Sequence, residues 1–229
     1  MSVSVLLLDL GGPVLNEDAE YAAWTEFLVG ALTGAGFPVS REEFEAALGA
    51  EIARGEANPW LAAAWRFVKP EAAVFRALRA EFRSLQEHFW SDLSGVEVRP
   101  EAAEAIPQLA LRYRLALAAN QPRGALDLLE RSGLLRHFAW QEVSETMGVS
   151  KPAPLFFRMI LDALGAEPAQ AVMVGDRLDL DVFPSKLLGL RTIRVLAGPY
   201  AGQEPVTPWH VPDRTVGSLA EVPSVLSAL

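Results

Sequence analysis

The chain contains two different patterns of hydrophobic positions. Short apolar runs typical of buried parallel strands occur near the N-terminus and again after residue 110, whereas residues 15–98 place their apolar side chains at helical spacing. Helices separate the later runs, as in a parallel sheet covered on both faces. The predicted strands are 3–8, 113–119, 138–143, 171–175, 191–195 and 214–216. The predicted helices between and after these strands are 100–111, 122–132, 155–164, 182–188 and one after Ser218.

The segment 15–98 is predicted to contain helices only. Asn16 is in position to cap a first helix, and Ser40 with Glu43 has the spacing of a capping box. Asn58 is followed by proline at the first position of a third helix, and a longer helix is predicted over 70–90. We therefore predict an α/β core formed by residues 1–14 and 99–229, interrupted by an all-helical domain at 15–98.

Composition narrows the class of protein. The chain has 229 residues, 51% of them hydrophobic, and a formal net charge of −9, which argues against a nucleic-acid or anionic-membrane partner. It has no cysteine, no basic region before its first apolar run and no apolar stretch long enough to span a bilayer. We expect a cytoplasmic protein without a signal peptide, whose oligomeric state the sequence does not indicate.

Polar residues stand where several predicted strands end. Asp9 follows the first strand, Asn120 follows the strand at 113–119, and Asp176 follows the strand at 171–175, with Asp181 five residues later. Lys151 precedes the helix at 155–164. Each of them alone has an ordinary explanation, such as a turn, a helix cap or a solvated charge. In open α/β sheets, however, ligands bind at the carboxyl ends of the strands, so the ordered set is a candidate active site.

This ordered set resembles the haloacid dehalogenase (HAD) superfamily. The resemblance covers residues 1–14 and about 100–229, and its most specific pieces are 150–156 and 174–181. It implies a Rossmann-like three-layer core with a parallel sheet. The helical insertion at 15–98 has the position and helicity of the alpha-helical C1 cap of that family, without a sequence motif. A hydrolase acting on a small phosphorylated substrate is the activity that the resemblance implies.

The resemblance also implies a nucleophile and a metal site. Asp9 would attack phosphorus and form an aspartyl-phosphate. Magnesium would be held by Asp9, Asp176 and the main-chain carbonyl of Gly11, and Asp181 would position Asp176 or the waters of the ion. Oxygen ligands of this kind suit a hard divalent cation.

A second group of residues is expected to bind the phosphate. Lys151 would neutralise charge on the nucleophile and on the phosphoryl oxygens. Backbone N–H groups of Gly11, Gly12 and Asn120 would cradle the phosphate. These roles, like those of the metal ligands, are implied by the resemblance.

The chain departs from the pattern of the family at four positions. Gly11 stands where most phosphatases of the family carry the aspartate that protonates the leaving group and later activates water. Ala119 replaces a serine or threonine whose hydroxyl binds the phosphoryl group. Pro13 and Arg177 replace residues that are usually Thr or Val and a small residue, respectively. Such a general acid contributes about 10²–10⁴ in rate, so we expect an altered or reduced activity.

Three functions remain open at this point. The first is a magnesium-dependent phosphatase whose substrates have good leaving groups or whose proton donor lies elsewhere. The second is a pseudoenzyme or metabolite-binding module, which the pair Gly11 and Ala119 favours. The third is a 2-haloacid dehalogenase, which needs no magnesium, and the presence of both Asp176 and Asp181 speaks against it.

Overall fold

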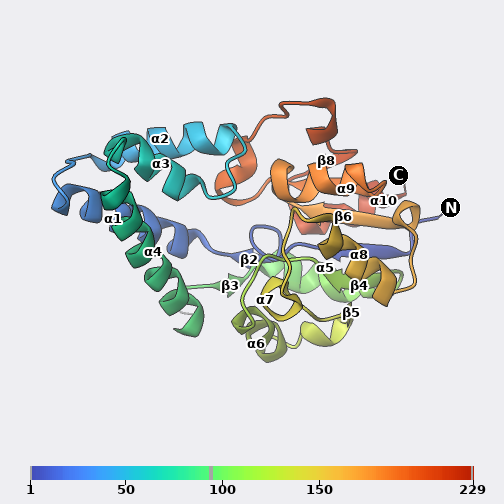
Figure 1. The fold of residues 1–229 in the computed structure, drawn as a ribbon. Coiled ribbons are helices and arrows are strands. Elements are labelled where there is room, and N and C mark those ends of the chain that lie inside the picture. Colours follow the sequence, from blue (N-terminus) through green and yellow to red (C-terminus); the bar gives the residue numbers. More distant parts are fainter. Residues whose placement is uncertain (1, 93–94, 228) are drawn as a thin grey trace. The chain divides into compact units, whose positions relative to one another are not determined.

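The protein is described by a computed structural model that covers residues 2–92, 95–227 and 229 (Figure 1). The chain divides into two compact units, one formed by residues 1–16 with 97–229 and the other by residues 17–96. The first unit contains the sheet and the helices that accompany its strands, and the second is helical.

The core of the first unit is a parallel sheet. Within the described residues it has six strands in the order β5-β4-β1-β6-β7-β8, and every neighbouring pair is parallel. The fold class predicted from the sequence is thus confirmed. The strands are β1 (Val5–Leu8), β4 (Arg114–Leu117), β5 (Phe138–Trp140), β6 (Ala171–Gly175), β7 (Arg191–Val195) and β8 (Arg214–Val216).

Strand β1 lies inside the sheet between β4 and β6, and all four of its residues have no exposed surface. Since successive side chains of a strand point to opposite faces, both faces of the sheet must be covered at β1. On one face, Val5 and Leu7 pack with Phe156, Phe157 and further residues of α8 (Pro154–Ala163) in one hydrophobic cluster. This burial on both faces explains why β1 is a continuous apolar run in the sequence.

Helices connect the strands of this unit, as the alternating pattern predicted. They are α5 (Pro100–Ala110), α6 (Gly124–Arg131), α7 (Ser144–Met147), α8, α9 (Phe183–Leu187) and α10 (Val222–Leu226). The predicted helix at 182–188 is preceded by a π-helical turn, Leu178–Val182, which the sequence pattern did not indicate.

The edge strand β5 is shorter than the predicted 138–143, since it ends at Trp140. The side-chain amide of Gln141, the next residue, donates hydrogen bonds to the carbonyls of Leu135 and Phe138, both at 3.0 Å.

The expectation that residues 15–98 form helices only was wrong at both ends. Two short strands, β2 (Leu15–Asn16) and β3 (Glu97–Val98), pair antiparallel with each other. Asn16 therefore belongs to a strand and does not cap a helix. The first helix has Glu17 at its N-cap position, without a capping hydrogen bond from that side chain.

The second unit consists of α1 (Asp18–Gly34), α2 (Arg41–Ala53), α3 (Pro59–Val68) and α4 (Ala72–Asp92). The capping box at Ser40 and Glu43 is confirmed, and the Asn58 carboxamide oxygen accepts a hydrogen bond from the Leu61 N–H at 3.1 Å. An aromatic cluster joins the helices, because the Trp60 ring contacts the rings of Tyr21 and Trp24. Throughout the described residues, no helix combines the length and the apolarity that crossing a membrane requires.

Candidate active site

The sheet brings the predicted site residues to its carboxyl edge. Asp9 directly follows β1 and Asp176 directly follows β6, and the Asp9 N–H donates to the carbonyl of Val174 at 2.9 Å. Lys151 and Asp181 reach the same place from the segments before α8 and before α9. Asp9, Lys151, Asp176 and Asp181 are all buried, which is unusual for charged residues and requires compensating partners.

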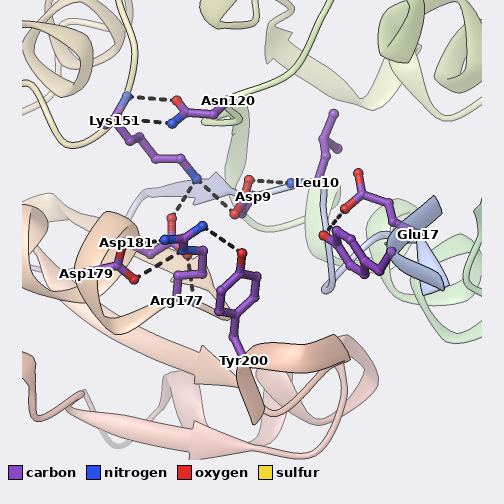
Figure 2. A network of polar contacts seen from close by, with 10 residues as sticks. Asp9, Leu10, Glu17, Asn120, Lys151, Arg177, Asp179, Asp181 and Tyr200 are labelled. Atoms are coloured by element: carbon purple, nitrogen blue, oxygen red, sulfur yellow. Dashed lines mark hydrogen bonds and ion pairs between the residues drawn. The ribbon is translucent and has the colours of Figure 1, made fainter. Parts of the chain in front are cut away.

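Lys151 bridges two of the carboxylates (Figure 2). Its ammonium lies 2.9 Å from Asp9 Oδ2 and 2.6 Å from Asp181 Oδ1. The other Asp9 oxygen, Oδ1, accepts a hydrogen bond from the Leu10 N–H at 2.8 Å. The nucleophile candidate is thereby fixed at both oxygens, and its orientation is set before any substrate arrives.

Asn120 positions the lysine. Its side-chain oxygen accepts from the Lys151 N–H at 2.8 Å, and its side-chain nitrogen donates to the Lys151 carbonyl at 2.9 Å (Figure 2). This two-point contact explains why an asparagine suits the position after β4. The expected role of the Asn120 backbone N–H in phosphate binding stays a prediction.

The turn after β1 makes room for Asp176. Gly12 has φ of +86°, and a Cβ atom there would lie 2.8 Å from Asp176 Oδ2 and 2.9 Å from its Cγ. Only glycine therefore fits both the backbone and the neighbouring carboxylate. The Gly12 N–H donates to the Leu15 carbonyl at 3.1 Å, and the Gly12 carbonyl accepts from Arg99 Nε at 2.6 Å. Phosphate binding by the Gly12 N–H thus stays a prediction, whereas its contact with Asp176 is a role that the sequence did not reveal.

Asp181 is held inside the loop after β6. Its side chain lies over Gly175, where an added Cβ would be 2.3 Å from Asp181 Oδ2. The same oxygen accepts from the Arg177 N–H at 3.0 Å, while Oδ1 contacts Lys151. The π-helical turn brings both Asp181 N and Val182 N to the Arg177 carbonyl, at 3.1 and 3.2 Å. Such π-turns occur frequently at functional sites.

Burial and neighbouring carboxylates raise the pKa of Asp9 and that of Asp176. Burial and the negative charge of Asp181 raise the pKa of Asp9 to about 7, although the Lys151 ammonium acts in the opposite direction. Burial and the charges of Asp9 and Asp181 likewise raise the pKa of Asp176 well above its usual range. Burial lowers the pKa of Lys151, but its two carboxylate partners outweigh burial and raise that pKa overall. Lys151 is therefore a permanent cation. Its single positive charge is smaller than the negative charge that Asp9, Asp176 and Asp181 carry together when ionised.

A divalent cation fits this imbalance. Among the described residues, Asp9, Asp176 and Asp181 offer carboxylate oxygens that all lie within 4.8 Å of one another. When all three carboxylates are ionised, the ammonium of Lys151 balances one of their three negative charges. Hard oxygen donors with a net charge of −2 suit Mg²⁺ or a similar ion.

Two positions lack the polar groups that the family pattern led us to look for. Gly11 has no side chain, and its backbone forms an isolated bridge with Leu15. Ala119 is fully buried, and its carbonyl accepts from the Ser144 N–H at 3.0 Å. Neither residue can supply a proton donor or a hydroxyl from its side chain.

The sequence missed a polar network around Arg177, which includes Asp179, Arg194, Tyr200 and Gln203. Arg177 was recognised only as an unusual residue after Asp176. Asp179 lies within the segment 174–181 but was given no role in the site. Arg194, Tyr200 and Gln203 carry no motif or periodicity that links them to the site, since Tyr200 lies 23 residues from Arg177 along the chain.

The whole chain has the architecture of haloacid dehalogenase-like proteins. A predicted phosphoglycolate phosphatase from Haemophilus somnus superposes with a TM-score of 0.71 at 19% identity, covering 98% of each chain. A 2-haloacid dehalogenase from Pseudomonas syringae gives a TM-score of 0.62 at 20% identity, covering 99% of each chain, so structural likeness defines the fold alone. Residues 3–186 match the haloacid dehalogenase-like hydrolase family, and the chain belongs to that family.

Curated relatives with phosphatase names match parts of the chain. A phosphoserine phosphatase from Thermus thermophilus is 39% identical over 144 residues, which cover 61% of this chain and 55% of the relative. A phosphoglycolate phosphatase from Rhodospirillum rubrum is 35% identical over 147 residues, covering 63% and 60%. The chain thus spans little more than half the length of these curated relatives.

Proposed function

We propose that this protein is a magnesium-dependent phosphatase of a small phosphorylated metabolite, with Asp9 as the nucleophile. The observation that carries the proposal is the buried arrangement of Asp9, Lys151, Asp176 and Asp181 at the carboxyl edge of the sheet. Membership of a hydrolase family and the phosphatase names of several relatives support it.

In the first step, a carboxylate oxygen of Asp9 forms a bond to phosphorus while the bond from phosphorus to the leaving oxygen breaks. The contact of 2.9 Å with Lys151 favours the ionised form of Asp9, against the effect of burial, and orients its carboxylate. In the second step, water attacks phosphorus, releases inorganic phosphate and restores the Asp9 carboxylate. Lys151 remains charged in both steps.

Asp9, Asp176 and the Gly11 carbonyl would hold the cation, and Asp181 would orient this group through Lys151 and the Arg177 N–H. When bound, Mg²⁺ supplies positive charge that offsets the repulsion between the carboxylate and the phosphoryl group. Residues 15–98, which carry α1 to α4 between the short strands β2 and β3, are proposed as the cap domain of this enzyme.

The glycine at position 11 restricts the substrates. With no side chain there to donate a proton, the leaving oxygen must depart as a weak base or take its proton from another source. We infer a preference for acyl phosphates and sugar 1-phosphates over simple alkyl esters. Phosphoserine and phosphoglycolate, named for relatives, belong to the second class and are useful comparisons.

A metabolite-binding module with little hydrolysis is the second candidate. The absence of side-chain donors at Gly11 and Ala119 is the specific observation in its favour. The two candidates differ in turnover and not in Mg²⁺ binding, so one assay separates them.

The test measures release of inorganic phosphate from acyl phosphates, sugar 1-phosphates and alkyl phosphate esters with Mg²⁺, beside 2-haloacids without it. We expect turnover of the activated phosphates, its loss with EDTA, and its loss in Asp9→Asn. Mass spectrometry after acid quenching should detect a phosphorylated protein. Asp127→Asn changes an exposed acid of α6 and is the matched control, with unchanged activity.

Three results would contradict the proposal. Full activity of Asp9→Asn would remove the nucleophile, and activity only on 2-haloacids would establish the dehalogenase. Mg²⁺ binding without hydrolysis of any ester would favour the binding module. Gly11→Asp examines the leaving-group argument separately, since it should raise the rates of alkyl esters by up to about 10²–10⁴ and those of acyl phosphates much less.

A further inference from the structure

Residues 198–203 contact the loop that carries Asp176 and Asp181 through side-chain hydrogen bonds and a ring contact. The Arg177 guanidinium lies over the Tyr200 ring, with its central carbon 4.2 Å from the ring centroid, and its Nη1 donates to the Tyr200 hydroxyl at 2.9 Å. The same guanidinium contacts Asp179 through Nε at 3.1 Å and through Nη2. Figure 2 shows Arg177 between Asp179 and Tyr200.

Two further side chains join the same pair of segments. Arg194, a buried residue of β7, donates to the carbonyls of Gln203 at 2.8 Å, Tyr200 at 2.7 Å and Asp176 at 3.3 Å. Gln203 accepts from the Leu178 N–H at 2.8 Å through its side-chain oxygen. Its side-chain nitrogen donates to Asp179 Oδ1 at 3.1 Å. Several hydrogen bonds thus join residues 198–203 to the loop after β6.

This network reaches two residues of the candidate metal site, Asp176 and Asp181. Asp176 immediately precedes Arg177, and the Arg177 N–H is a hydrogen-bond donor to Asp181 Oδ2. Arg177 therefore connects the network to the backbone that presents Asp176 and to the amide that holds Asp181. Arg177 forms an ion pair with Asp179, so the contacts of its side chain within this network fix its position.

We propose that Arg177 and Tyr200 are positioning residues that set the affinity of the Asp9, Asp176 and Asp181 cluster for Mg²⁺. The inference rests on the proposed function, since it concerns the cation of the same site. Partners that orient metal ligands typically change metal affinity by about 10–100-fold when mutated. An arginine that is both stacked and hydrogen-bonded in this way is poorly replaced by lysine.

The test is a Mg²⁺ titration of the substrate-free protein, followed by the rise in melting temperature and by calorimetry. Tyr200→Phe keeps the ring and removes the hydroxyl, and should weaken Mg²⁺ binding by roughly tenfold. Arg177→Met removes the contacts with Tyr200 and Asp179 and should weaken Mg²⁺ binding further, toward roughly 100-fold. In turnover assays, the apparent Mg²⁺ requirement should rise while kcat at saturating Mg²⁺ stays near that of the wild type.

Tyr113→Phe is the matched control, because Tyr113 also lies beside an arginine, with Arg112 at 5.9 Å from its ring, outside this network. We expect it to bind Mg²⁺ like the wild type. Equal Mg²⁺ affinity in the wild type and Tyr200→Phe would overturn the inference and leave the proposed function intact. A lower melting temperature of Tyr200→Phe with an unchanged Mg²⁺ midpoint would show a merely structural contact, and also overturns it. Absence of Mg²⁺ binding in the wild type would instead reject the metal site, and with it both proposals.

Discussion

The close packing of Gly175 against Asp181 predicts that Gly175→Ala severely destabilises the protein. Gly175 ends β6, and a Cβ atom there would lie 2.3 Å from Asp181 Oδ2, 2.4 Å from Cγ and 2.7 Å from Cβ. The contact with Cβ is decisive, because no rotation of the Asp181 side chain moves that atom away. The turn at 178–182 must shift if alanine is to fit.

The cost follows from the two groups that hold Asp181. Forcing an extra methyl group into a packed interior costs about 1–3 kcal/mol. A shift of Asp181 also weakens its hydrogen bonds with Lys151 Nζ at 2.6 Å and the Arg177 N–H at 3.0 Å, and one lost charge-assisted bond costs about 1.5–3 kcal/mol. We therefore expect a loss of about 2.5–6 kcal/mol in the free energy of unfolding, a large part of the typical total of about 5–15 kcal/mol.

Urea unfolding at pH 7 with EDTA measures this free energy. Gly49→Ala is the matched control, because Gly49 lies exposed within α2 and an added Cβ has no neighbour within 4 Å. The same substitution there should stabilise the protein by about 0.5–1 kcal/mol. The same glycine-to-alanine change is thus expected to lower the free energy of unfolding at position 175 and to raise it at position 49. Equal stability of Gly175→Ala and the wild type would refute the packing of Asp181 over Gly175.

Three other variants test the charged contacts. Lys151→Met should destabilise the metal-free protein by about 3–5 kcal/mol, because it leaves two buried carboxylates unpaired, whereas Lys186→Met at a partly exposed ion pair should cost no more than about 1 kcal/mol. Burial raises the pKa of Asp213, but hydrogen bonds from Lys186 and Thr192 outweigh it and place that pKa below the ordinary value. The contribution of Asp213 is therefore complete above about pH 4 and is lost as the pH falls through the lowered value. Asp213→Asn should cost about 0.2–1 kcal/mol at pH 7, and this difference in urea unfolding should shrink in acid; a constant difference would contradict the assignment.

The sequence predicted the sheet and the place of its acidic residues for a physical reason. A strand buried on both faces is a continuous apolar run, as Val5–Leu8 is, and the carboxyl ends of parallel strands meet at one edge. Asp9 and Asp176 could therefore be placed together from the pattern alone. The contacts of Lys151 could not, because the pattern gives no direction for a side chain that precedes a helix.

What the sequence could not predict depends on contacts between distant loops. Tyr200 and Gln203 lie in a short turn with no periodic pattern, and only the fold brings them to the loop after β6. The pairing of Leu15–Asn16 with Glu97–Val98 is too short for alternation to appear. Asn120 was selected by its place after a strand, but the choice between a cap, a phosphate ligand and a support for Lys151 needed its hydrogen-bond partners.

The distribution of buried charge connects the fold with the proposed chemistry. Burying unpaired carboxylates is costly, and a core built only for stability would replace them by apolar residues. Here Arg177 pairs with Asp179, whereas the Lys151 ammonium contacts Asp9 and Asp181 beside the third carboxylate of the cluster, Asp176. The uncompensated charge is thus confined to the place where Asp9 would meet a phosphoryl group, and a divalent cation would neutralise it. Gly11 leaves this balance unchanged because it carries no charge, so its consequence is restricted to the proton of the leaving group.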